Sequence, residues 1–154
     1  MSWTTWKGDC VSMPTTNELA YIAGLFDGEG CIQHKQIMDT KRKSRPRRYK
    51  VWRITMEMSM TDKDIIEWVH KTLDVGTVLI NIKNKSPSSK PHWKTQWRWR
   101  CGHRQAYKVC KMLWPYIQVK LPQVEKIIDH YEPEFLMNDK VVSLHQYKQN
   151  MDME

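Results

Sequence analysis

The stretch "NELAYIAGLFDGEGCI", residues 17–32, decides the fold. It carries apolar residues at helical spacing, namely Leu19, Ile22, Leu25 and Phe26. It also contains Gly24 and Gly28, although a glycine inside a helix costs about 1 kcal/mol relative to alanine. The run then ends on two carboxylates, Asp27 and Glu29, which are set between glycines. Both the small residues and the acids need an explanation beyond helix formation.

The length and composition predict one domain. A chain of 154 residues is long enough to bury a sizeable core. We expect an N-terminal extension over 1–14, a single domain over 15–132 and a C-terminal tail over 133–154. No run of about 18 apolar residues predicts a membrane span, so no membrane partner is expected. The first residues lack the apolar region of a signal peptide. We therefore expect an intracellular protein, in the cytoplasm, an organelle or a phage-infected cell, with its four dispersed cysteines reduced.

Positive charge is concentrated in two segments. Residues 33–53 hold nine Lys or Arg and one Asp, a balance of 9 − 1 = +8 that equals the net charge of the whole chain. Residues 83–100 add six Lys or Arg and no acid. Such a distribution is typical of a surface that binds a polyanion. The alternatives are solvated basic loops, or a localisation signal in "KRKSRPRR".

The pattern along the chain predicts an α+β domain. Thr15 and Glu18 have capping-box spacing, which predicts a helix over 16–28. A strand over 30–38 and an alternating strand over 49–60 follow. Thr61 is the expected N-cap of a second helix over 62–73. Strands are then expected over 76–83 and 92–101. Two closing helices are expected over 104–117, with a break near Pro115, and over 121–131. The tail has room for one more short helix. This order indicates one antiparallel sheet covered by helices on one face.

Alternation within the second and fourth strands separates two faces. We expect the core face to carry Trp52, Ile54, Met56, Met58 and Met60 together with Trp93, Trp97 and Trp99, although tryptophans stacking on bases are the alternative. The free face then presents Arg53, Thr55, Glu57, Ser59, Lys94, Gln96, Arg98 and Arg100. These side chains reach phosphates and base edges. With Gln33, Lys35, Arg45, Arg47, Arg48 and Lys83 they form the expected DNA-binding surface. We assign phosphate contacts to Lys35, the 41–48 loop, Arg98 and Arg100, and base contacts to Arg53 and Gln96.

The small residues of the opening stretch predict a helix pair. Ala20, Gly24 and Gly28 lie at i, i+4 and i+8, with Ala23 beside them. Small residues in this register let a second helix approach closely. No other segment offers such a stripe, so the expected partner is the same helix of a second copy. Two Glu29 carboxylates would then converge beside a polyanion, and Mg²⁺ is the cation that suits oxygen ligands and phosphate.

"IAGLFDGEG", residues 22–30, resembles the signature of the LAGLIDADG homing endonucleases. Five positions match that signature letter for letter: Ala23, Gly24, Leu25, Asp27 and Gly30. Four depart conservatively: Ile22 and Phe26 stay apolar, Gly28 stays small and Glu29 keeps a carboxylate. The resemblance covers about residues 15–131, because the second helix and the closing helices also look like those of the family. It implies the αββαββα LAGLIDADG fold.

The resemblance also implies an activity. Single-motif members of the family are site-specific double-strand DNA endonucleases, often intron-encoded, that act as homodimers on near-palindromic targets. Each subunit cuts one strand across the minor groove and leaves short 3′ overhangs. The implied cofactor is Mg²⁺, with Mn²⁺ expected to substitute. Two alternatives stay open: a maturase, which is an RNA-binding splicing factor with the same fold, and a DNA-binding regulator that has lost catalysis.

Site roles follow from the resemblance residue by residue. Glu29 and the Gly28 carbonyl are the implied metal ligands, and Asp27 is expected to steady the facing helix of the dimer. Lys120, near the start of the last helix, is the implied contact of the catalytic solvent. Met60 stands where the family often has a glutamine, so the water-positioning role falls to Ser59, Asp62 or Arg98.

Overall fold

The computed structural model describes residues 13–39, 50–81 and 92–137, and its elements follow the predicted order. They are α1 (Thr16–Glu29), β1 (Gly30–Met38), β2 (Lys50–Met60), α2 (Lys63–Leu73), β3 (Thr77–Asn81), β4 (Gln96–Gly102), α3 (Arg104–Leu113), α4 (Leu121–Tyr131) and the 3₁₀ helix η3 (Pro133–Met137). The predicted break near Pro115 is confirmed, because α3 ends at Leu113. The short tail helix is η3, and the residues beyond it lie outside the described part.

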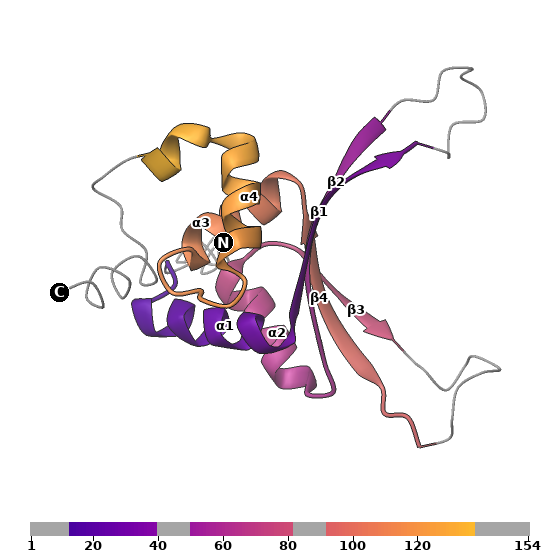
Figure 1. Ribbon diagram of the computed structural model, residues 1–154. Coiled ribbons are helices and arrows are strands. Elements are labelled where there is room, and N and C mark those ends of the chain that lie inside the picture. The colour runs from indigo at the N-terminus through magenta and orange to yellow at the C-terminus, as the bar shows by residue number, and fades with distance from the viewer. Residues whose placement is uncertain (1–12, 40–49, 82–91, 138–154) are drawn as a thin grey trace, which may run out of the picture.

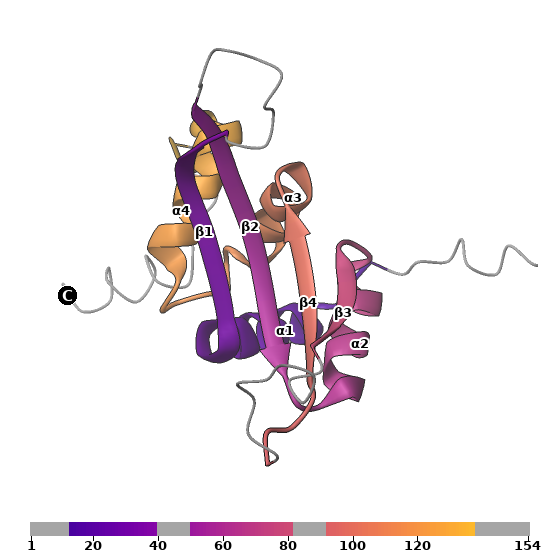
Figure 2. The ribbon, with the colours of Figure 1, turned by 90° about the vertical axis from the view of Figure 1, so that its right-hand side faces the viewer.

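One antiparallel sheet carries the domain, with strand order β1-β2-β4-β3. All helices of the described residues lie on one face of this sheet, and no described element lies over the opposite face (Figure 1). Seen from that side, the four strands lie in front of the helices (Figure 2). The predicted α+β class and one-sided helical cover are therefore confirmed. Among the described residues, no helix is long and apolar enough to cross a membrane.

Capping residues set the helix starts. In α1 the Thr15 hydroxyl accepts from the Glu18 N–H at 3.2 Å, and the Glu18 carboxylate accepts from the Thr15 N–H at 2.9 Å. The predicted capping box is confirmed. The prediction of Thr61 as the N-cap of α2 is wrong, because the Asp62 carboxylate accepts from the Ile65 N–H at 3.1 Å. An anionic cap also interacts favourably with the positive end of the helix dipole.

The core lies between the helices and one face of the sheet. The methionine-rich face of β2 is buried there through Ile54, Met56 and Met58, as predicted. Trp99 is also fully buried, and its indole N–H donates to the Val75 carbonyl at 2.9 Å. Trp97 packs against this core as predicted.

Two tryptophans that we expected in the core lie outside it. Trp93 precedes β4 and is 39% exposed, and Trp52 is 40% exposed. Trp52 stacks on His34 of β1, with ring centroids 4.5 Å apart, and meets His130 of α4 edge-on at 4.9 Å. Trp52 lies near the outer end of β2, where α4 is the helix of the described residues that contacts it.

Candidate active site and nucleic-acid interface

The C-terminal end of α1 is tied to the segment that leads into α4. One oxygen of the Asp27 carboxylate accepts from the Gln118 N–H at 2.9 Å, and the other accepts from the Lys120 N–H at 3.0 Å. A carboxylate that accepts from two backbone N–H groups makes charge-assisted hydrogen bonds, which are stronger than neutral ones. Asp27 therefore fixes the start of α4 against the end of α1.

This finding adds a role for Asp27 that the sequence did not predict. We predicted that it would steady the facing helix of a second copy. Its carboxylate holds Gln118 and Lys120 of its own chain, and the contact with a facing helix stays a prediction. Sequence spacing could not reveal this contact, because the partners are backbone groups more than 90 positions away.

Lys120 lies where the resemblance implied, at the N-cap position of α4. Its ammonium group donates to the Asp27 carbonyl at 2.6 Å. That carbonyl belongs to the last turn of α1, which holds no basic residue of its own. The negative end of a helix dipole favours a cation. Lys120 thus brings a positive charge to the same helix end as Glu29.

Glu29 is the last residue of α1, and both Glu29 and Gly28 are exposed. Carboxylate and main-chain carbonyl oxygens are hard donors of the kind that Mg²⁺ prefers. The donor types at this helix end therefore fit the expected ion. Within residues 13–39, 50–81 and 92–137, no three His, Cys, Asp or Glu side chains form a group that could hold a metal ion.

The predicted stripe of small residues is exposed along α1. Ala20, Gly24 and Gly28 face outward and, with Tyr21, Leu25 and Glu29, line a hollow of about 520 Å³. A Cβ added at Gly24 or Gly28 would meet no other atom within 4 Å. Gly30 is different, because its Cβ would lie 2.5 Å from the Phe26 carbonyl oxygen. The chain itself thus requires a glycine at 30 but not at 24 or 28.

Ala23 does not belong to this exposed stripe. It is fully buried among core residues that include Ile22 and Phe26. The prediction that Ala23 contacts a second copy is therefore wrong, because the side chain already packs inside its own domain.

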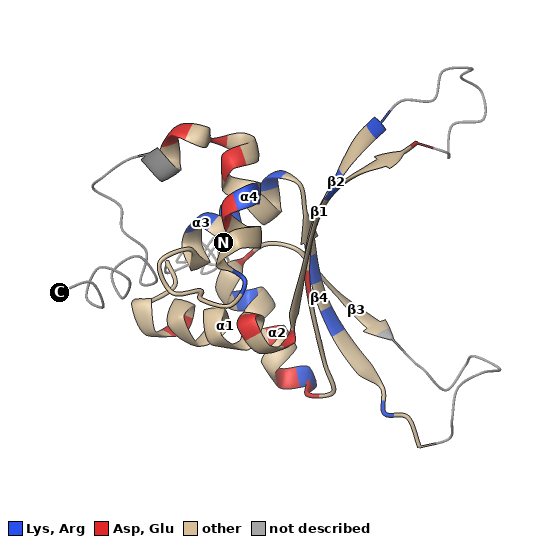
Figure 3. Ribbon diagram, viewed as in Figure 1, with Lys and Arg blue, Asp and Glu red and all other residues tan. Residues whose placement is uncertain are grey.

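The open sheet face carries the predicted polar side chains. Charged residues lie along β2 and β4 (Figure 3), and they alternate with the buried residues Ile54, Met56, Met58 and Trp99, so their side chains lie on the side away from the helices. Lys35, Arg53 and Arg100 are exposed, Gln33, Glu57, Ser59, Gln96 and Arg98 are half-buried, and Lys94 is exposed just before β4. Thr55 is buried, with 8% of its surface exposed. Arg45, Arg47, Arg48 and Lys83 lie outside the described residues.

Contacts between neighbouring strands orient two of the arginines. The Nε of Arg98 donates to the Ser59 hydroxyl at 3.1 Å. The Nε of Arg100 lies 3.9 Å from a Glu57 carboxylate oxygen. Each pair is in register across β2 and β4. Arg98 is thus held by a hydrogen bond, and Arg100 has an acidic neighbour at ion-pair distance on the same open face.

Sequence reasoning missed the open-face residues of the edge strand β3. Thr77 and Leu79 of β3 pair with Arg100 and Arg98, so they belong to that face, and both are exposed. Leu79 is 47% exposed. The sequence carries no period-two signal here, because Val78, Leu79 and Ile80 are three consecutive apolar residues.

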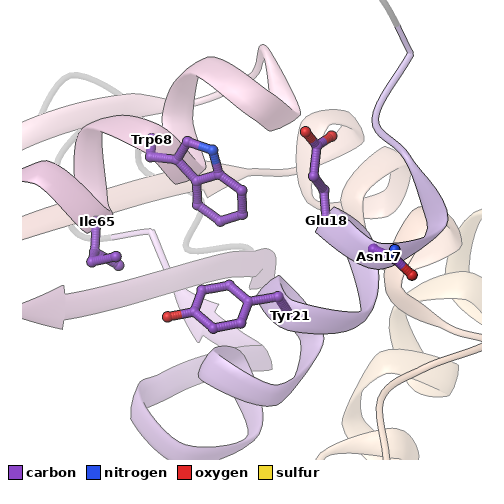
Figure 4. A pocket seen from close by; sticks show the side chains of 5 residues that line it. All are labelled: Asn17, Glu18, Tyr21, Ile65 and Trp68. Carbon is purple, nitrogen blue, oxygen red and sulfur yellow. The ribbon is translucent and has the colours of Figure 1, made fainter.

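A second hollow, of about 460 Å³, lies between α1 and α2 (Figure 4). The rings of Tyr21 and Trp68 meet edge to face there, with centroids 5.6 Å apart. Its one carboxylate, Glu18, already serves in the capping box of α1. We therefore assign the candidate active site to the opposite end of α1, at Glu29.

Solved structures of LAGLIDADG homing endonucleases share this fold. The homing endonuclease I-CvuI, in complex with the I-CreI target, matches with a TM-score of 0.52 and 20% identity, over 79% of this chain and 74% of that chain. I-TnaI matches with a TM-score of 0.52 and 18% identity, over 80% and 79% of the two chains. The archaeal intron-encoded homing endonuclease I-Vdi141I, complexed with DNA, matches with a TM-score of 0.53 and 12% identity, over 73% of this chain and 65% of that chain. No protein-family model matches the chain, and no curated protein does.

Proposed function

We propose that the chain is a site-specific double-strand DNA endonuclease that acts as a homodimer and needs a divalent metal. One observation carries the proposal: Asp27 and Lys120 bind each other at the end of α1, beside the exposed carboxylate of Glu29. This end of α1 continues directly into β1 of the open sheet. A carboxylate and a cation thus adjoin a surface suited to a polyanion. The neighbours I-CvuI and I-Vdi141I were both solved with DNA.

The proposed chemistry is hydrolysis of a phosphodiester bond. Glu29 and the Gly28 carbonyl would hold Mg²⁺, which when bound offsets the charge of the scissile phosphate and acidifies a water molecule. Lys120 stabilises negative charge that develops on the phosphate oxygens. Asp27 positions Lys120, because its carboxylate holds the Lys120 backbone while its carbonyl accepts from the ammonium group.

The homodimer is supported by glycines that the domain does not need. Alanine at Gly24 or Gly28 would meet nothing and would be the better helix former. A second copy of α1 packed against the stripe could approach closely, because Gly24 and Gly28 have no side chains in the way. Such a two-fold pair brings two Glu29 residues together and gives one active site for each DNA strand.

Cleavage of a randomised double-stranded DNA library with Mg²⁺ tests this function. We expect wild-type protein to cut a small subset of duplexes, with paired cuts on the two strands and short 3′ overhangs. Omission of the metal should abolish cutting. Mn²⁺ should restore it.

The same preparation separates the two alternatives. A maturase would bind structured RNA in preference to the duplex library and would leave the DNA intact. An inactive regulator would select duplexes without cutting them under either metal. Either result would contradict the proposed endonuclease.

A further inference from the structure

The strand register arranges the open sheet face in rows that run across the strands. Residues paired in an antiparallel sheet point to the same side. One row consists of Leu79, Arg98 and Ser59 on β3, β4 and β2. The next row consists of Thr77, Arg100, Glu57 and Cys31 on β3, β4, β2 and β1. Each row therefore has an arginine on a central strand with a polar neighbour on β2.

Each arginine turns Nε, the inner nitrogen of the guanidinium, toward its polar neighbour on β2. The Nε of Arg98 donates to the Ser59 hydroxyl at 3.1 Å, and the Nε of Arg100 lies 3.9 Å from a Glu57 carboxylate oxygen. The hydrogen bond from Nε orients the guanidinium of Arg98, and the Glu57 carboxylate attracts the guanidinium of Arg100. In both, the terminal nitrogens form the fork that matches N7 and O6 of guanine. Fixing the side chain before binding reduces the ordering cost when the base is bound.

The place of these arginines in the sheet favours bases over phosphates. β4 is flanked by β2 and β3, so Arg98 and Arg100 lie on an inner strand. Strands lie about 4.8 Å apart, and the major groove is about 12 Å wide. Side chains of inner strands therefore face the floor of the groove, where the base edges lie, and those of edges and loops face its walls.

We propose, on the basis of the DNA endonuclease function above, that Arg98 and Arg100 read two guanines separated by one base pair in each half-site, and that Leu79 contacts the methyl group of a thymine beside the Arg98 guanine. Residues two apart on a strand are separated by about 6.7 Å, which equals two base-pair rises of about 3.4 Å.

The neighbours of the two arginines extend this reading. Glu57, beside Arg100, can accept from N4 of the cytosine in the same G·C pair. Leu79 is the exposed apolar group in the row of Arg98, and apolar side chains contact the thymine methyl. This proposal replaces the phosphate contacts that the sequence alone suggested for Arg98 and Arg100.

Selection of bound duplexes from a randomised library without Mg²⁺ tests the guanine contacts. Wild-type protein should enrich half-sites with two guanines one base pair apart. Arg98→Ala should lose the preference at one of these positions by about 5- to 150-fold and keep the other, and Arg100→Ala should do the reverse. Arg98→Lys keeps the charge without the fork, so it should lose the guanine preference while binding mixed DNA nearly as well as wild type. Lys108→Ala on α3, which also removes one exposed positive charge, should keep both preferences.

Replacement of thymine by uracil tests Leu79, because uracil lacks only the methyl group. Wild-type protein should bind the uracil half-site more weakly, and Leu79→Ala should bind both half-sites equally. If the two arginine variants lost affinity equally for all sequences, the proposed guanine contacts would be wrong, but the proposed DNA-binding function would still hold. If Leu79→Ala still distinguished thymine from uracil, the methyl contact would be overturned. If wild-type protein bound no duplex, both this inference and the proposed function would fail.

Discussion

Replacement of Gly24 by leucine should have opposite effects on the stability of the single domain and on the formation of the dimer. In a single chain a Cβ at Gly24 meets nothing within 4 Å, so the new side chain fits. Leucine is a better helix former than glycine by about 0.5–1 kcal/mol. The isolated domain should therefore gain that much in free energy of unfolding, which corresponds to a rise of about 1–4 °C in Tm for a domain of this size.

The same substitution should abolish the dimer. Two leucines across the two-fold axis would push the helix axes toward the usual spacing of about 8–10 Å and remove the close backbone contact. Sedimentation velocity should show wild-type dimers and Gly24→Leu monomers. The Tm of wild type should rise with protein concentration, and that of the variant should not. Cleavage should disappear with the dimer.

Gln105→Leu on α3 is the matched control, because it places the same side chain on an exposed helix position elsewhere. It should remain dimeric and active. A Gly24→Leu protein that sedimented as a dimer and cut DNA at the wild-type rate would refute the reasoning.

Three further expectations concern affinity, pH and positioning. The logarithm of the DNA association constant should fall linearly with the logarithm of salt concentration, and Lys35→Ala should lower the slope by about 0.9 in binding titrations; an unchanged slope would remove Lys35 from the phosphate contacts. Burial, then His130 and Lys126, lower the pKa of His34 from its usual 6.5. At acidic pH the folded state thus binds fewer protons at His34 than the unfolded state does. The contribution of neutral His34 to the free energy of unfolding is therefore complete above about pH 6.5 and is lost as the pH falls through the lowered pKa. Tm should drop more between pH 8 and 5 in wild type than in His34→Phe, and equal drops would contradict this. Asp27→Ala removes the acceptor of two backbone N–H groups and should cost about 1.5–3 kcal/mol in urea unfolding, whereas a loss near zero would show that the contact does not hold α4.

The elements of the fold were largely predictable because local signals mark them. Thr15 and Glu18 form the capping box that the spacing predicted, and the alternation in β2 placed Met56 and Met58 in the core. The start of α2 was missed by one residue, because Thr61 and Asp62 are adjacent residues of two types that both cap helices.

The candidate site was predictable in its residue types but not in its contacts. Lys120 lies at the start of α4, as the resemblance implied. The bonds from Gln118 and Lys120 to Asp27 depend on how the chain packs over more than 90 residues, and no local pattern encodes that. Ala23 was placed with the exposed small residues because spacing alone does not tell which side of α1 faces the sheet. The structure shows that Ile22, Ala23 and Phe26 form that side.

The central claim is that Glu29 holds the metal for DNA cleavage, and one substitution tests it most directly. Glu29→Gln keeps the shape of the side chain and removes its charge, and a neutral amide is a poor ligand for a hard divalent cation. Glu29 is exposed, and an acid at a helix C-terminus interacts unfavourably with the helix dipole. The substitution should therefore leave the fold intact. Cleavage and DNA binding should be measured on the same preparation with Mg²⁺ and with Mn²⁺. We predict wild-type or tighter binding and no detectable cleavage with either metal, whereas cleavage at the wild-type rate would show that the active site lies elsewhere.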